Sequence, residues 1–230
     1  LQTGVHQELV NSVKTDICNL SKAKKKGIKV GALKFRKNVN RIYLRTGMLK
    51  IKSSKTVSIP MFRKLSVYGL EQFINIPNFE IANANLIRKS SGFYIMVTVF
   101  FPKESNIVKT NKTVGLDFGI KTAITTSDGE KFDNIRVTKK YEKKLAKEQR
   151  KLAHKVKRGK NYEKQRIKVA KIYEKTHNTR LDYLHKISHK LISENQVIVS
   201  EDLAVSNMVK NHNLVKAITD CGWYELTRQI

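Results

Sequence analysis

The stretch Thr113-Val-Gly-Leu-Asp-Phe-Gly119 decides the fold expected for this chain. Its alternation predicts a β-strand that carries small residues around Asp117 on one face. The other face is apolar and consists of Val114, Leu116 and Phe118. Because an unpaired charge inside a sheet costs several kcal/mol, the carboxylate of Asp117 needs a cation or a hydrogen-bond partner.

A second stretch, Val197-Ile-Val-Ser-Glu-Asp-Leu203, predicts another strand that ends in acidic residues. It places Glu201 or Asp202 at the strand exit, 84 residues after Asp117 in the case of Glu201. Carboxylates gathered from distant strand ends are typical ligands of Mg²⁺ in phosphodiester chemistry. Taken alone, either acid fits a turn-forming or helix-capping residue better, and it is the combination with a very basic chain that favours the metal site.

The charge of the chain favours a polyanionic partner. Its 230 residues include 46 Lys and Arg against 19 Asp and Glu, which gives a formal net charge of +27. Such an excess predicts strong, salt-sensitive binding to phosphates, and nucleic acid is the first choice. The sequence has no run of about 20 apolar residues and no signal-peptide pattern, so we expect no membrane association and a cytoplasmic location. Cys18 and Cys221 form no CxxC pair, which argues against a zinc site or a disulfide framework within these residues.

The pattern along the chain predicts an N-terminal helix, a β-rich region and an α/β region. Helical spacing covers residues 1–27, and short alternating runs over residues 28–110 predict a small antiparallel sheet or β-barrel. Clear strands in that region are Arg41 to Leu44, Met48 to Ile51, Thr56 to Ile59 and Phe93 to Phe100. Phe35 and Tyr43, among basic residues, are candidates for base stacking, although a place in the core fits each equally well.

The region 111–230 begins with the Asp117 strand and a hairpin that turns at Asp128-Gly129. A basic helical insertion over 138–194 follows, in which residues 138–190 hold 19 Lys and Arg against 5 Asp and Glu. After the strand that carries Glu201, a three-to-four spacing of apolar residues predicts one final helix over residues 214–230, with Trp223 in the core.

The amino-acid sequences of these motifs resemble those of one protein family. Five segments carry the resemblance: Val114 to Lys121, Tyr141 to His154, Asp182 to Ser188, Glu201-Asp-Leu, and Lys216 to Trp223. They resemble TnpB, the OrfB protein of bacterial insertion sequences, which is similar to the type V CRISPR effectors. The resemblance implies an RNase H-like domain with a RuvC nuclease site, preceded by a wedge-type β-barrel and a helical piece of a recognition lobe.

The same resemblance implies an RNA-guided DNA endonuclease, a class also called transposase, that works with guide RNA and DNA. Carried over by position, Asp117 is the first catalytic, metal-binding carboxylate and Glu201 the second, with Mg²⁺ as the cofactor. Asp202 is the neighbouring alternative, because side-chain alternation lets only one of the pair face the metal.

Two features of the family are absent from these residues: a third catalytic Asp and a zinc ribbon with two CxxC pairs. We therefore expect the chain to be the central portion of a TnpB-like protein, with an incomplete RuvC domain and zinc expected only in the missing ribbon. Little or no cleavage but retained RNA and DNA binding is then expected. The alternatives are a nuclease-inactive nucleic-acid-binding protein and a non-functional remnant of a mobile element.

Overall fold

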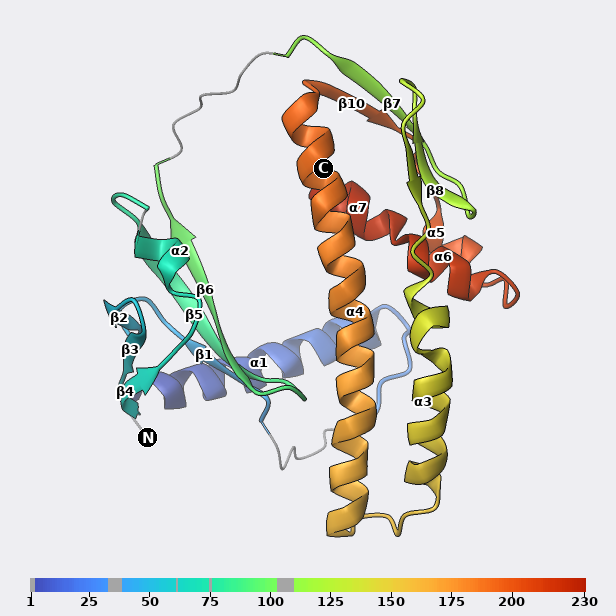
Figure 1. Ribbon diagram of the computed structural model, residues 1–230. Helices are drawn as coiled ribbons and strands as arrows, with labels where there is room; N and C mark the ends of the chain where they lie inside the picture. Colours follow the sequence, from blue (N-terminus) through green and yellow to red (C-terminus); the bar gives the residue numbers. More distant parts are fainter. Residues whose placement is uncertain (1–2, 33–38, 61, 75, 103–109) are drawn as a thin grey trace. The chain divides into compact units, whose positions relative to one another are not determined.

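A computed structural model describes residues 3–32, 39–60, 62–74, 76–102 and 110–230 (Figure 1). The chain divides into two compact units, Leu1–Ser105 and Asn106–Ile230, and each is described here by itself. The proposed stacking residue Phe35 lies outside the described residues.

The first unit contains one long helix and two small antiparallel sheets, with strand orders β1-β5-β6 and β2-β3-β4. Its elements are α1 Thr3–Lys25, β1 Arg41–Leu44, β2 Lys50–Ser53, β3 Thr56–Ile59, β4 Phe62–Ser66, α2 Glu71–Ile74, β5 Glu80–Arg88 and β6 Phe93–Phe100. The predicted N-terminal helix is confirmed, as are the strands at β1, β3 and β6. Val5 of α1 is buried, whereas Leu9, Val13 and Ile17 remain exposed.

The expected closed barrel is wrong for the described part of this unit. A barrel needs hydrogen bonds from strand to strand around a complete ring. Here each sheet pairs only within itself, and both are interrupted by irregular register. The two sheets instead share one apolar core, in which Leu44 and Ala84 of one sheet join Val57 and Ile59 of the other.

The second unit is built on a four-stranded sheet of order β10-β7-β8-β9. Its elements are β7 Thr113–Asp117, β8 Thr122–Thr126, β9 Lys131–Asp133, α3 Val137–Ala153, α4 Lys160–Glu194, β10 Val197–Ser200, α5 Val205–Met208, α6 Val215–Cys221 and α7 Trp223–Gln229. Strands β7, β8 and β9 are antiparallel neighbours, and β10 runs parallel to β7. The predicted hairpin turn at Asp128-Gly129 is confirmed between β8 and β9.

One face of this sheet is covered by helices. Val114 and Leu116 of β7 and Ile124 of β8 are buried in a core with Leu184 and other residues of α4. The N-terminal part of α4 lies beside α3 and forms an antiparallel helical hairpin with it (Figure 1). Residue alternation along β7 therefore leaves Asp117 on the other, exposed face.

The single helix expected over residues 214–230 is in fact two helices, α6 and α7. They meet at Gly222, whose φ of 66° is left-handed and incompatible with a continuous α-helix. The apolar spacing is the same on both sides of the break, so the periodicity did not reveal it. Trp223 begins α7 in the core, as predicted, and its indole Nε1 donates to the carbonyl of Ala123 over 2.9 Å.

A buried ion pair joins the helical hairpin to α6. The carboxylate of Asp220 accepts hydrogen bonds from the backbone N–H of Thr138 (2.9 Å) and from its hydroxyl (2.6 Å) at the start of α3. It also accepts one from Arg180 of α4 (2.8 Å), and its side chain is only 3% exposed. This group of contacts, the Asp220 node, satisfies one free backbone N–H in the first turn of α3 and joins three helices to one another.

We predict that Gly222→Ala lowers the free energy of unfolding of the second unit by about 3 kcal/mol. An alanine at this position would have to keep the left-handed φ, and its Cβ would lie 2.7 Å from Cδ1 of Leu184. The matched control is Gly129→Ala, where φ is 84° but no atom lies within 4 Å, so it costs about 1 kcal/mol. Urea unfolding followed by fluorescence of Trp223, the single tryptophan, measures both. Equal losses in the two variants would contradict the proposed contact with Leu184.

We also predict that Asp220→Ala destabilises the second unit by about 3 to 5 kcal/mol, because it leaves the largely buried guanidinium of Arg180 without its partner. Asp182→Ala is the control, since Asp182 forms an exposed ion pair with Lys186 on α4. Such a pair contributes at most about 0.5 kcal/mol to the free energy of unfolding. The same fluorescence-detected unfolding distinguishes the two. Similar losses would show that the Asp220 node does not stabilise the unit.

Candidate active site

The two acids predicted from the sequence lie side by side at one end of the sheet. Asp117 is the last residue of β7, and Glu201 directly follows β10. The parallel register pairs Ser200 with Leu116, so each acid stands one residue beyond that pair. Two carboxylates 84 residues apart in sequence are thereby presented at the same edge.

Both acids line one shallow hollow of about 450 Å³ on the exposed face of the sheet. Its other lining residues are Gly115, Leu116, Thr125, Thr126, Ser127, Val199 and Ser200. Asp202 is not among them, which favours Glu201 as the acid that shares the hollow with Asp117. The walls combine small or hydroxyl-bearing residues with the apolar Leu116 and Val199, and both carboxylates are open to solvent.

The crossover between the two strands explains why these acids meet. Parallel neighbours need a connection that returns the chain to the same end of the sheet, usually through a helix. Here that connection contains the β8–β9 hairpin and the long helices α3 and α4. Leu184 and Leu191 of α4 pack against the face of the sheet opposite Asp117. This packing positions the C-terminal end of α4, and therefore the start of β10, which follows directly in the chain.

The donor set suits a hard divalent cation but does not complete its shell. In the described part of the chain, neither Asp117 nor Glu201 forms an ion pair with a protein cation, so both carboxylates can accept a metal. The residues that the structure describes contain no cluster of three or more His, Cys, Asp or Glu that could hold a metal ion. Two carboxylates fit Mg²⁺, which usually retains several waters and binds through one or two protein carboxylates.

Cys221 belongs to the core. It is buried, its thiol lies 3.0 Å from the side-chain amide of Asn134, and it donates weakly to the carbonyl of Gly119. Burial, with the nearby charge of Asp220 as a smaller cause, raises the pKa of this thiol from 9.0 to about 11. The other cysteine, Cys18, is exposed.

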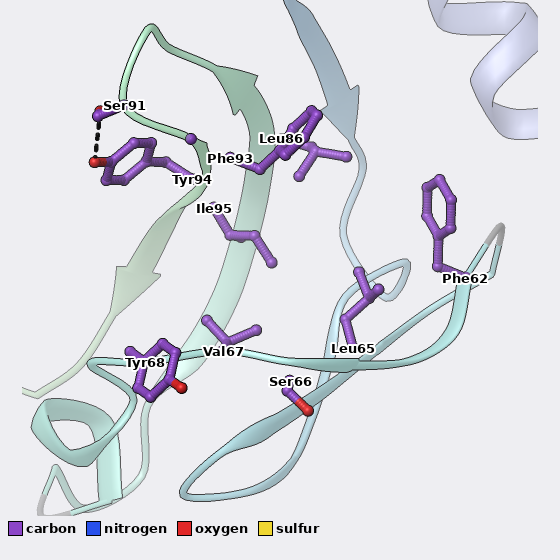
Figure 2. A pocket seen from close by; sticks show the side chains of 11 residues that line it. Phe62, Leu65, Ser66, Val67, Tyr68, Leu86, Ser91, Phe93, Tyr94 and Ile95 are labelled. Atoms are coloured by element: carbon purple, nitrogen blue, oxygen red, sulfur yellow. Dashed lines mark hydrogen bonds between the residues drawn. The ribbon is translucent and has the colours of Figure 1, made fainter. Parts of the chain in front are cut away.

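Sequence reasoning missed an apolar cleft in the first unit. Figure 2 shows side chains from β4 and the segment after it, including Phe62 and Tyr68, opposite side chains of the β5–β6 hairpin, including Phe93 and Tyr94. The cleft has a volume of about 580 Å³, and the hydroxyl groups of Ser91 and Tyr94 lie 2.8 Å apart. The proposed stacking residue Tyr43 lies outside its lining and is 38% exposed on β1. Alternation along Phe93–Phe100 predicted the strand, but the cleft depends on the distant partner β4.

None of the helices in the described ranges contains a stretch long and apolar enough to span a bilayer.

Comparison with known proteins places residues 96–212 in a family described as "Probable transposase". Both Asp117 and Glu201 lie inside the matched region. The match covers about half of the chain, and it includes the sheet strands β7 to β10 and the complete helical hairpin.

Two curated relatives carry the name "Putative RNA-guided DNA endonuclease". One, from Streptomyces pristinaespiralis, is 43% identical over 117 residues, which are 51% of this chain and 29% of the relative. The other, InsQ from Escherichia coli K12, is 33% identical over an alignment of 165 positions that covers 65% of this chain and 41% of the relative. The matched part of the chain thus spans less than half the length of either relative.

We predict that a thiol reagent at pH 8 modifies Cys18 rapidly and Cys221 only after unfolding, because the Cys221 thiol is buried and its pKa is raised. Mass spectrometry after short labelling, with and without denaturant, measures this. Fast labelling of both cysteines in the native protein would contradict the structure around Cys221.

The raised pKa also makes stability depend on pH. Because the Cys221 thiol ionises at a lower pH in the unfolded chain than in the folded one, raising the pH from about 9 to 11 should lower the free energy of unfolding.

Proposed function

The chain belongs to the TnpB/OrfB family of insertion-sequence proteins, and we propose that its second unit is the carboxylate-bearing part of an RNA-guided DNA endonuclease. The observation that carries this proposal is the parallel pairing of β10 with β7, which brings Asp117 and Glu201 into one hollow. Neither acid has a structural role there that would account for its position, because neither caps a helix or forms an ion pair within the described residues.

The topology supports the RNase H-type, RuvC-like assignment of this unit. Three antiparallel strands are followed by a helical crossover and a strand parallel to the first, and the two acids stand at the ends of this parallel pair, β7 and β10. By the same analogy with the family, residues 28–110 correspond to the wedge domain and residues 1–27 to part of the recognition lobe. Functional sites vary on a given fold, so the assignment of activity rests on the two carboxylates and the family.

We propose Asp117 and Glu201 as the ligands of Mg²⁺. A bound divalent cation would supply Lewis-acid chemistry for phosphodiester hydrolysis, through activation of water and stabilisation of the leaving oxygen. The chain's own contribution is to hold two oxygen donors at fixed neighbouring strand ends. The hollow lies on the exposed face of the sheet, and its lining includes the small residues Gly115 and Ser127 beside the two carboxylates.

Guide RNA and target DNA are the proposed partners. The formal net charge of +27 supplies the sequence-independent attraction to phosphates, and base pairing with the guide would select the target. The endonuclease name belongs to relatives of which the matched residues span less than half, and we extend this activity to the chain as a proposal.

The direct test is binding of Mn²⁺, a paramagnetic substitute for Mg²⁺, to the 230-residue chain by electron paramagnetic resonance. We predict that Asp117→Ala and Glu201→Ala each weaken Mn²⁺ binding about tenfold or more, because each removes one of two protein ligands. Fluorescence anisotropy with labelled RNA and DNA should show that both variants still bind nucleic acid.

Asp202→Ala and Asp128→Ala are the matched controls, since both remove an exposed acid of the same unit that does not line the hollow. Neither should change Mn²⁺ affinity. A loss in Asp202→Ala instead of Glu201→Ala would assign the second ligand to the neighbouring residue. Nucleic-acid binding without any Mn²⁺ binding would favour a protein that binds but does not cut.

A further inference from the structure

A second hollow of about 380 Å³ lies between α3 and α4, on the helical hairpin of the second unit. Its lining is rich in lysine and consists of Tyr141, Lys144, Glu148, Lys151, Lys168, Lys171, Ile172 and Lys175. Five ammonium groups thus share the hollow with one carboxylate. None of its lining residues lies in the hollow that contains Asp117 and Glu201.

The spacing of these residues shows that the hollow is one continuous seam. On α3 the lining residues are three, four and three positions apart, from Tyr141 to Lys151, and on α4 they follow similar intervals from Lys168 to Lys175. Residues at these intervals lie on one face of a helix. A seam between two packed helices normally carries apolar side chains, and Ile172 is buried as this rule expects. The five lysines of the hollow lie on the exposed flanks of this seam, where their ammonium groups reach solvent and can meet an external anion.

The protein itself balances little of this positive charge. Glu148, the one carboxylate in the lining of the hollow, pairs with Lys151 at 2.9 Å, and the charge of Lys168 also acts on it. Glu148 is also held by the buried side chain of Gln165, whose Nε2 donates to its carboxylate over 2.7 Å. Hydrogen bonds from Gln165 and Lys151 lower the pKa of Glu148, so that it stays ionised and fixed.

An aromatic ring orders one end of the hollow. Nζ of Lys175 lies 5.9 Å from the centre of the Tyr141 ring, and Nζ of Lys140 lies at the same distance from it. Such cation–π contacts favour lysine conformations near the ring. Lys175 is therefore held beside the ring at this end of the hollow, and Lys140, which does not line the hollow, adds a further positive charge next to it.

We propose that this lysine seam is a binding site for the sugar-phosphate backbone of a nucleic-acid strand. Consecutive phosphates are the anions that several converging lysines on a helical hairpin can neutralise together, with release of counterions. The site contacts no base edge and therefore contributes affinity and position but not sequence selection. The proposal rests on the proposed function in that it takes nucleic acid as the ligand, and it assigns this role to residues outside the carboxylate site.

The test compares two triple variants by fluorescence anisotropy over a range of salt concentrations. The seam variant carries Lys144→Gln, Lys168→Gln and Lys171→Gln. The control variant carries Lys143→Gln, Lys147→Gln and Lys157→Gln, three exposed lysines of the same hairpin that do not line the hollow. Both lose the same net charge. Labelled single-stranded RNA and DNA of one mixed sequence are the two probes.

We expect the seam variant to bind at least one probe about tenfold more weakly than the control variant. The slope of log affinity against log salt should fall by about 2 in magnitude, as expected for about three lost contacts to a single strand. The probe that loses affinity identifies the seam as an RNA or a DNA site. A variant with arginine at the same three seam positions should restore binding, which separates loss of charge from loss of folding.

Equal affinities and slopes in the seam and control variants would overturn the inference. That result would leave the proposed function standing if Asp117→Ala and Glu201→Ala still lose Mn²⁺. Failure of the unsubstituted chain to bind either probe would overturn both the seam and the proposed partners.

Discussion

The parallel pairing of β10 with β7 is the constraint on which the rest of the second unit depends. It places Ser200 opposite Leu116 and so brings the following acids, Glu201 and Asp117, to one edge of the sheet. Parallel neighbours demand a long crossover, and α3 and α4 provide it. The apolar part of α4 covers one face of the sheet, which leaves the carboxylates on the other.

The two ends of α4 serve different purposes. Its C-terminal part contributes Leu184 and Leu191 to the core, whereas its N-terminal part pairs with α3 and carries the lysine seam. The Asp220 node connects the hairpin to the core, because it joins the first turn of α3 and the middle of α4 to α6. Positive charge on the hairpin is thereby held on a rigid support in the same unit as the carboxylates.

Alternation and turn chemistry predicted the local structure well. Val114 and Leu116 predicted β7 and its buried face, and Asp128-Gly129 predicted the hairpin. Sequence reasoning could not show that β2–β4 pair apart from β1, β5 and β6, because partner choice depends on contacts between distant residues. The break at Gly222 was missed for another reason, since Ile218 and Leu226 keep a helix-like spacing across it. Arg180 and Asp220 meet across 40 residues, and no local pattern marks such a pair.

The most direct test of the account is a crystal structure of the chain soaked with Mn²⁺, with the ion located by its anomalous scattering. We predict an anomalous peak in the hollow, at direct-coordination distance from carboxylate oxygens of both Asp117 and Glu201, as expected for a small divalent cation with oxygen ligands. A peak elsewhere, with these two carboxylates bound only to water, would contradict the assignment of this sheet edge as the metal site.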